Sequence, residues 1–217
     1  SGKRALITGS SQGIGFALAR GLAGAGAEII LNGRDEAKLE AARQELGDEG
    51  ATVHSLAFDA TDHEAVRRAV DGFEAEVGAI DILINNAGMQ HRTELHNFPP
   101  DAFERLLQTN IASVFHVGQA VARHMIARKG GKIINIASVQ TALARPGIAP
   151  YTATKGAVGN LTKGMATDWA QYAPTPAPPP IKEMTGGSEK EFGFPRLTMV
   201  KDSMPPCGLF PKSCPFP

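Results

Sequence analysis

The chain has 217 residues, with 22 basic and 22 acidic side chains. Its length fits one domain with a full core, and the balanced charge, without long runs of one sign, predicts no nucleic-acid partner. The longest apolar segments fall far short of the roughly 20 residues of a membrane span, and the first residues lack a signal-peptide pattern. We therefore expect a soluble, cytoplasmic protein without a membrane partner.

Five short segments read as strands. They are nearly continuous in apolar and β-branched residues, which is typical of strands covered on both faces of a parallel sheet. These segments are residues 4–8, 28–32, 52–58, 81–86 and 132–138.

Segments with helical spacing of apolar residues alternate with these strands, and several end in glycine, a helix-terminating signal. They cover residues 13–26, 35–50, 61–78, 101–130 and the stretch from about Tyr151 to Tyr172. Alternating strands and helices predict an α/β fold, a doubly wound parallel sheet of the Rossmann type.

The pattern changes after Tyr172, where five of the seven residues from Pro174 to Pro180 are proline. Proline lacks the donor that a central strand needs and disrupts helices, so we expect mostly irregular chain over 173–217. We assign residues 1–172 to dinucleotide binding and catalysis, and 173–217 to an atypical tail of the same domain. Both cysteines, Cys207 and Cys214, lie in that tail; their spacing matches no zinc pattern, so we expect free thiols and no metal site.

A glycine-rich turn, "TGSSQGIG" at 8–15, follows the first strand and opens directly into a helix. Its glycines allow a tight turn and a close approach of the backbone to a pyrophosphate, whose charge then lies at the helix N-terminus. The context predicts a dinucleotide site, with contacts from Gly9, Ser11, Gly13, Ile14 and Gly15.

The end of the second strand bears on the choice of cofactor. An acidic residue there would bind the ribose 2′-hydroxyl of NAD, but the chain reads "LNGRDE", with Arg34 followed by Asp35. Arg34 could pair with a 2′-phosphate, so the sequence favours NADP over NAD. The alternative is that Arg34 is an ordinary exposed residue and Asp35 the helix N-cap.

Tyr151 and Lys155 in "YTATK" are four residues apart and share one helix face. An ammonium held beside a phenol stabilises the phenolate, so a tyrosine in that setting can exchange a proton near neutral pH. Ser138 follows the fifth strand at the sheet edge where ligands collect, and its hydroxyl could bind the reacting oxygen. Without the glycine turn, Tyr151 and Lys155 would read as a surface pair.

Taken together, five motifs resemble the short-chain dehydrogenase/reductase family over about residues 3–172. They are "TGSSQGIG", "NNAG" at 85–88, Asn110 in "LLQTNIASVF", Ser138 and "YTATK". The resemblance implies that Tyr151 is the acid/base, that Lys155 assists it and holds the nicotinamide ribose, and that Ser138 orients the substrate oxygen. It implies that Asn110 anchors a water by distorting its helix.

The same resemblance implies cofactor contacts further along the chain. Asp59 would reach the adenine amino group, while Asn86, Ala87 and Gly88 would line the ribose edge. Taken singly, Asn110 could be a surface amide and Asp59 a residue near a helix N-cap. Family members often form dimers or tetramers through the long helices that begin here near Asp101 and Tyr151.

Longer stretches, such as "IDILINNAGMQHR", resemble the gluconate 5-dehydrogenases of this family. That resemblance implies hydride transfer between NADP(H) and C5 of a sugar acid. Arg92 and Arg145 could bind the carboxylate, and Gln90, His91 and Gln140 the hydroxyls; each arginine could equally be an ordinary surface residue.

The tail leaves two further functions open. Family members continue into a sixth strand, a substrate lid and a seventh strand, and none of these is recognisable after Tyr172. The tail could be a misread family terminus, a natural truncation or a divergent lid. Alternative functions are therefore another carbonyl reductase, with 3-oxoacyl or polyol substrates, or an inactive cofactor-binding remnant with the edge of the fifth strand uncovered.

Overall fold

The computed structural model describes residues 2–172 and 198–200, and their strands form a single parallel sheet. The strand order is β3-β2-β1-β4-β5-β6. The strands are β1 (Arg4–Ile7), β2 (Glu28–Gly33), β3 (Val53–Ala57), β4 (Ile82–Asn85), β5 (Lys132–Ile136) and β6 (Thr198–Val200). The chain order reverses between β1 and β4, which is where open α/β sheets place their ligands.

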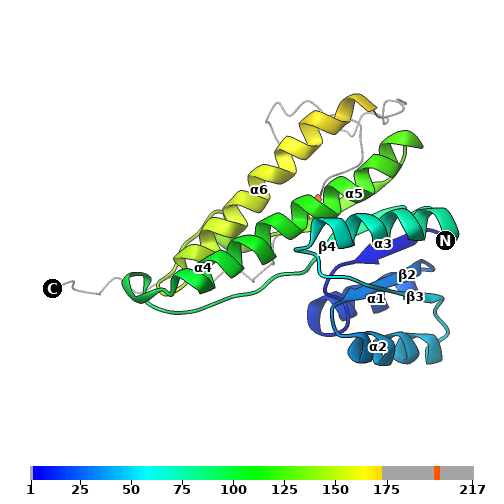
Figure 1. Ribbon diagram of the computed structural model, residues 1–217, viewed down its shortest axis with the longest axis horizontal. Coiled ribbons are helices and arrows are strands. Elements are labelled where there is room, and N and C mark those ends of the chain that lie inside the picture. Colours follow the sequence, from blue (N-terminus) through cyan, green and yellow to red (C-terminus); the bar gives the residue numbers. More distant parts are fainter. Residues whose placement is uncertain (1, 173–197, 201–217) are drawn as a thin grey trace, which may run out of the picture.

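Helices cover both faces of the sheet, as the sequence predicted. They are α1 (Gly13–Gly24), α2 (Glu36–Asp48), α3 (His63–Glu76), α4 (Pro100–Leu107), α5 (Ser113–Ala127) and α6 (Ala149–Trp169), with short turns of helix at Leu95–Asn97, Val139–Thr141 and Ala170–Tyr172. Figure 1 shows α2 on one side of the sheet and α3 with α5 on the other. The doubly wound α/β prediction is confirmed.

Two apolar cores follow from the alternation of side chains along each strand. Leu6 of β1 faces the core that α3 and α5 close, whereas its neighbours Ala5 and Ile7 face the core that α1 and α2 close. The same alternation repeats in β2, β4 and β5. The near-continuous hydrophobicity of these strands is therefore the signature of a sheet buried on both faces.

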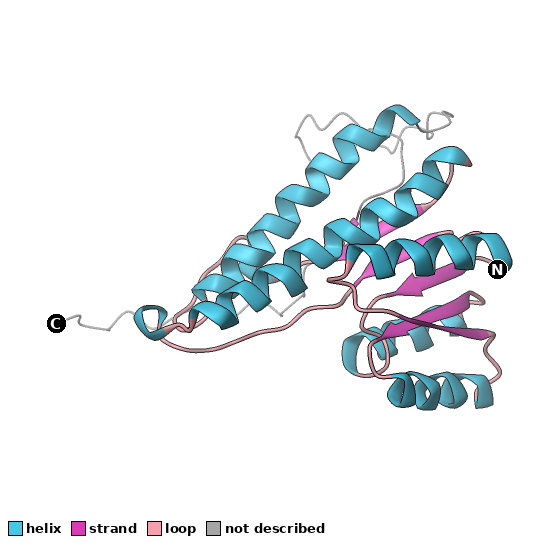
Figure 2. Cartoon of the chain, in the orientation of Figure 1, coloured by secondary structure: helices cyan, strands magenta, loops and turns pink. Residues whose placement is uncertain are grey.

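The predicted helix over 101–130 is not continuous. It begins at Pro100 and is interrupted by a π-helical turn at Gln108–Ala112, between α4 and α5. A π-turn inserts one residue into the helical repeat and is common at functional sites. Figure 2 shows the resulting long helical path lying beside α6 and reaching beyond the sheet.

Part of the segment that we expected to be irregular is a strand. Thr198–Val200 pairs in parallel with Ile134, Asn135 and Ile136 of β5, so the outer edge of β5 has a neighbour. The alternative in which the edge of the fifth strand is uncovered was wrong. Proline is the most frequent residue after Tyr172, so the composition of this segment did not indicate the three-residue strand, although two of its residues are β-branched. Cys207 and Cys214 lie outside the described residues, and so does the rest of the predicted tail.

Candidate functional site

The glycine turn adopts the conformation that its sequence predicts. Gly9 and Gly13 both have φ of +62°, in the left-handed region that favours glycine. At Gly15 the constraint is space, because a Cβ there would lie 2.3 Å from the carbonyl oxygen of Gly9 and 2.6 Å from Asn86 Nδ2. The third glycine therefore lets α1 start directly against the turn.

The "NNAG" loop after β4 is tied to this turn. The Thr8 hydroxyl accepts hydrogen bonds from the backbone N–H groups of Asn86 and Ala87, both at 3.0 Å. Asn86 Nδ2 in turn donates to the carbonyls of Thr8 and Gly9, at 3.0 and 3.1 Å. These bonds make one unit of two loops that lie 77 residues apart in the sequence.

The N-terminus of α1 differs from those of α2 and α3. Asp35 caps α2 and Asp62 caps α3 with their carboxylates. In the described part of the chain no side chain caps α1, and its first turn has no acidic residue. Its N–H groups and positive dipole end are thus left for an anion, as the pyrophosphate prediction requires.

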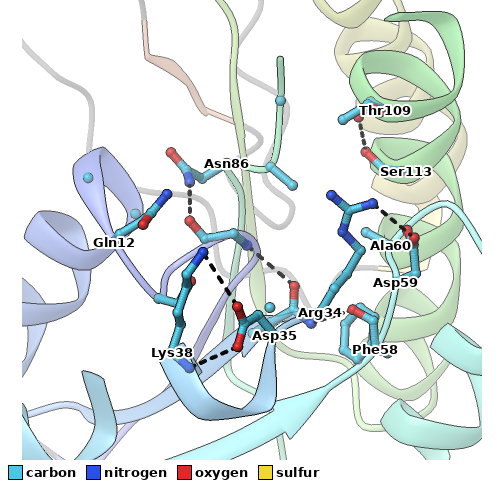
Figure 3. Close-up of a pocket in the computed structure, with 18 of the residues that line it drawn as sticks. Gln12, Arg34, Asp35, Lys38, Phe58, Asp59, Ala60, Asn86, Thr109 and Ser113 are labelled. Atoms are coloured by element: carbon cyan, nitrogen blue, oxygen red, sulfur yellow. Dashed lines mark hydrogen bonds and ion pairs between the residues drawn. The ribbon is translucent and has the colours of Figure 1, made fainter. Parts of the chain in front are cut away.

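A cavity of about 860 Å³ lies over the turn and extends along the ends of β1, β2 and β4 (Figure 3). Every predicted cofactor residue other than Tyr151 and Lys155 lines it. These are Gly9, Ser11, Gly13, Ile14, Gly15, Arg34, Asp59, Asn86, Ala87 and Gly88. The cavity has the size of small-molecule sites and stands at the topological switch point of the sheet.

Two cations face the far end of this cavity, each beside a carboxylate (Figure 3). Arg34 Nη1 lies 3.4 Å from Asp59 Oδ2, with 78% of the arginine side chain exposed, and Lys38 Nζ lies 3.4 Å from Asp35 Oδ2. Both pairs are long and solvent-accessible, so they are weak and open to exchange for an anionic ligand. Asp35 also caps α2, as the alternative interpretation held, but that role leaves Arg34 facing the cavity.

The carboxylates at this end are held in their charged form. Burial acts to raise the pKa of Asp59, but hydrogen bonds from the backbone and hydroxyl of Thr61, with the nearby Arg34, outweigh it and bring that pKa below its ordinary value. The pKa of Asp35 is lowered chiefly by the backbone N–H of Lys38, with a further contribution from the Lys38 ammonium. The cavity therefore has two cationic and two anionic side chains next to one another at the end of β2.

Tyr151 and Lys155 lie together on the first turns of α6. The Lys155 ammonium is 5.8 Å from the centre of the Tyr151 ring and donates a 2.8 Å bond to the carbonyl of Ile136, the last residue of β5. Lys155 is 6% exposed. Ser138, two residues after β5, is buried too, and its hydroxyl accepts a bond from the backbone of Gln140 at 3.2 Å. All three therefore gather at the carboxyl end of β5.

Asn110 occupies the middle of the π-turn and is fully buried. Its Oδ1 accepts from the Met89 backbone at 2.8 Å, and its Nδ2 donates to the Met89 carbonyl and to Thr154 Oγ1, both at 3.0 Å. The alternative of a helix-surface amide was wrong. A Cβ at Gly88 would lie 3.4 Å from Asn110 Oδ1 and 3.8 Å from Lys155 Nζ, so the catalytic candidates border the cavity at Gly88.

The residues predicted to bind substrate follow β4 and β5 in the chain. Arg92 and Arg145 are both exposed, and Arg92 donates to Gln90 Oε1 at 3.1 Å. The loops are joined by a 3.1 Å bond from the Thr93 backbone to the Gly147 carbonyl. His91 stacks edge-on against Phe98 at 5.1 Å. Gln140 follows Ser138, and its Oε1 is buried. The structure thus brings the two loops together at the carboxyl side of the sheet.

Comparison with known proteins identifies the family. The model of the short chain dehydrogenase family matches residues 3–177. The chain belongs to the short-chain dehydrogenase family. The family prediction, and with it the prediction of an enzyme, is confirmed.

Several relatives of the chain within the short-chain dehydrogenase family are named for reactions of sugar acids. The chain is 58% identical to the gluconate 5-dehydrogenase of Gluconobacter oxydans, over 79% of this chain and 67% of that protein. It is 45% identical to the 5-keto-D-gluconate 5-reductase of Escherichia coli, over 79% and 68%. Among solved structures, the gluconate 5-dehydrogenase of Burkholderia cenocepacia in complex with NADP and tartrate aligns with a TM-score of 0.78 and 59% identity, over 80% and 68%.

Two buried polar residues beside the glycine turn, Asn32 and Ser10, were missed by the sequence reasoning. Asn32 is buried, and its Nδ2 donates to the carbonyls of Leu56 and Phe58, at 3.0 and 3.2 Å. Its backbone N–H donates to the Ser10 hydroxyl at 3.0 Å, and that hydroxyl donates to the Ile7 carbonyl at 2.7 Å. An asparagine inside an otherwise apolar strand was the available signal, because a buried amide needs several partners.

In the described part of the chain, no helix is long and apolar enough to span a bilayer.

Proposed function

We propose that this chain is an NADP(H)-dependent oxidoreductase that interconverts gluconate and 5-ketogluconate by hydride transfer at C5 of the sugar acid. The observation that carries the reaction type is that Lys155 and Asn110 lie at Gly88, on the rim of a dinucleotide-sized cavity, with Tyr151 beside Lys155. The substrate is supported by the names of the relatives, and by the tartrate, itself a hydroxy acid, in the Burkholderia enzyme.

The residues present fit a nicotinamide dinucleotide phosphate. The left-handed glycines, the uncapped start of α1 and the missing Cβ at Gly15 form a cradle for a pyrophosphate. Arg34 and Lys38 supply positive charge for a 2′-phosphate, and Asp59 supplies an acceptor for an adenine amino group. When bound, the reduced cofactor supplies the hydride that reaches the C5 carbonyl carbon.

Tyr151 acts as the acid in reduction. Its hydroxyl gives a proton to the C5 oxygen while the carbon gains the hydride, so a carbonyl becomes an alcohol and a phenolate remains. The buried Lys155 ammonium stabilises that phenolate, because a charge interacts more strongly in a low-dielectric setting. Ser138 donates a bond that orients the substrate oxygen. A solvent proton restores Tyr151, and the oxidation of gluconate reverses each step.

Arg145 and Arg92 bind the carboxylate of the sugar acid. Both are exposed on loops that the Thr93–Gly147 bond holds together, so they can reach one ligand. We expect Arg145→Ala to raise the KM for 5-ketogluconate about tenfold with little change in kcat, because one charge-assisted bond is lost. Steady-state kinetics measure this, and an unchanged KM would remove Arg145 from the site.

The deciding experiment is oxidation of NADPH by the full chain with a panel of 5-ketogluconate, 3-oxoacyl thioesters and keto-polyols. Turnover confined to 5-ketogluconate supports the proposal. Turnover of another class instead assigns the chain to a different carbonyl reductase. Binding of NADPH, followed by fluorescence, without turnover of any of them identifies a cofactor-binding remnant.

We also propose a homodimer or homotetramer. Phe103 of α4 and Phe115 of α5 are 40% and 43% exposed on the long helical path that reaches beyond the sheet (Figure 1). Exposed aromatic side chains on such a path suit a helix-to-helix interface between copies. Sedimentation equilibrium measures the mass, and a monomer at micromolar concentration would contradict the proposal.

A further inference from the structure

Besides the Lys155 bond to the Ile136 carbonyl, two polar contacts of similar geometry join helix α6 to the rest of the protein. In each, a buried threonine hydroxyl accepts a bond from a buried asparagine Nδ2 and donates to a carbonyl of its own helix. The first contact joins Thr154 to Asn110 at 3.0 Å and to the Tyr151 carbonyl at 2.8 Å. The second joins Thr162 to Asn135 at 2.9 Å and to the Val158 carbonyl at 2.7 Å.

The direction of the first contact is fixed by chemistry. A carbonyl only accepts, so the Thr154 hydroxyl donates its proton in a hydrogen bond to the backbone carbonyl of Tyr151. A lone pair of the Thr154 oxygen is then left to accept from the Asn110 amide. Met89 fixes the amide orientation independently, since its N–H requires Asn110 Oδ1 on that side. Thr154 is 0% exposed, and so is Asn110. Thr154 is a side-chain partner of this amide, whereas Met89 contacts it through backbone groups.

The two contacts lead to different places. Asn135 lies in β5 and accepts a bond from Asn85, the last residue of β4, at 2.9 Å, so the Thr162 contact fastens α6 to the strands themselves near the carboxyl ends of β4 and β5. Asn110 lies in the π-turn and holds Met89, next to Gly88 at the cavity rim. The Thr154 contact therefore links the helical turn that carries Tyr151 and Lys155 to the loop that lines the cavity.

We propose that Thr154 is a positioning residue for the reaction: its hydroxyl sets Asn110 and the Met89 loop relative to Tyr151 and Lys155. This inference rests on the proposed function. Proton transfer is sensitive to displacements below 1 Å, and an isosteric valine would leave one Asn110 donor without an acceptor in a buried place. The Asn110 amide and the Met89 loop then shift toward other partners.

The test compares Thr154→Val with Thr162→Val in the full chain. Both variants keep the side-chain shape and remove one buried hydroxyl that bridges an asparagine to the helix, so we expect similar falls in melting temperature. Only Thr154→Val should lower kcat, by about 10- to 100-fold, and displace the pH profile of kcat. Thr154→Ser keeps the hydroxyl and should restore most of the activity and the wild-type profile.

A second readout needs no turnover. Because the Thr154 contact acts through the cavity rim, Thr154→Val should also raise the Kd for NADPH, whereas Thr162→Val should not. Equal effects of the two valine variants on kcat, pH profile and Kd would overturn the inference, and so would a failure of Thr154→Ser to restore the profile. A wild-type chain that turns over no substrate refutes the proposed function, and the two Kd values then decide on Thr154 alone.

Discussion

The proposed cofactor side and the proposed substrate side of this site are held in place by different kinds of bond. On the cofactor side, the buried side chains of Thr8, Ser10 and Asn32 form hydrogen bonds with backbone groups of the turn and its neighbours. On the substrate side, one backbone bond between Thr93 and Gly147 joins loops whose arginines are exposed. The proposed cofactor side is thus a rigid frame, whereas the loops that carry the proposed substrate residues can change at little cost to stability.

The largest expected effect falls where the two sides meet. Tyr151→Phe removes the proposed acid, so kcat should fall by about 10²- to 10⁴-fold while the Kd for NADPH changes little. The matched control is Tyr172→Phe, because the chain has only two tyrosines and Tyr172 is exposed beyond the end of α6. Stopped assays of 5-ketogluconate reduction measure both. Equal rates for the two variants would refute the role of Tyr151.

A second large effect tests the rigidity of the cofactor side. A Cβ at Gly15 would collide with the Gly9 carbonyl, so Gly15→Ala should shift the turn, lower the free energy of unfolding by about 1–3 kcal/mol and abolish tight NADPH binding. At Gly21, in the same helix, such a Cβ would have no atom within 4 Å beyond its chain neighbours and the adjoining helix backbone, so Gly21→Ala should stabilise the protein by about 0.5–1 kcal/mol. Urea unfolding and NADPH titration separate them, and normal binding by Gly15→Ala would show that the turn is not the pyrophosphate site.

The rigid side was predictable from the sequence because its signals are local. Glycines at 9, 13 and 15, continuous apolar strands and the spacing of Tyr151 and Lys155 each follow from a short stretch of chain. The helix distortion at Asn110 was implied only by the family resemblance, and the hydrogen-bond partners of Asn32 and Thr154 could not be named from the sequence, since they depend on which group lies across from each residue after folding. The same reason leaves Arg92 and Arg145 as proposals: an exposed arginine in a loop has no local signal that separates a ligand contact from a surface residue.

A smaller effect addresses cofactor choice at the outer end of the cavity. Arg34→Ala removes one charge-assisted contact to a 2′-phosphate, so the Kd for NADPH should rise about 10-fold or more while the Kd for NADH stays unchanged. Arg43→Ala serves as the control, because Arg43 pairs with Glu40 on α2 and does not line the cavity. Fluorescence titration with both cofactors measures the ratio. A parallel loss for NADPH and NADH would place Arg34 outside the phosphate contact.

The smallest expected effect concerns Asp59 and pH. Its folded pKa lies below its ordinary value, since the Thr61 bonds and Arg34 outweigh the effect of burial, so the charged carboxylate stabilises the fold above the unfolded pKa of about 4. That contribution disappears as the pH falls through the lower folded pKa. Asp59→Asn should therefore unfold at lower urea than the wild type at pH 7, and the two should converge at strongly acidic pH. If the urea midpoints of Asp59→Asn and the wild type differ by the same amount at all pH values, Asp59 contributes hydrogen-bond geometry, and not charge, to this end of the cavity.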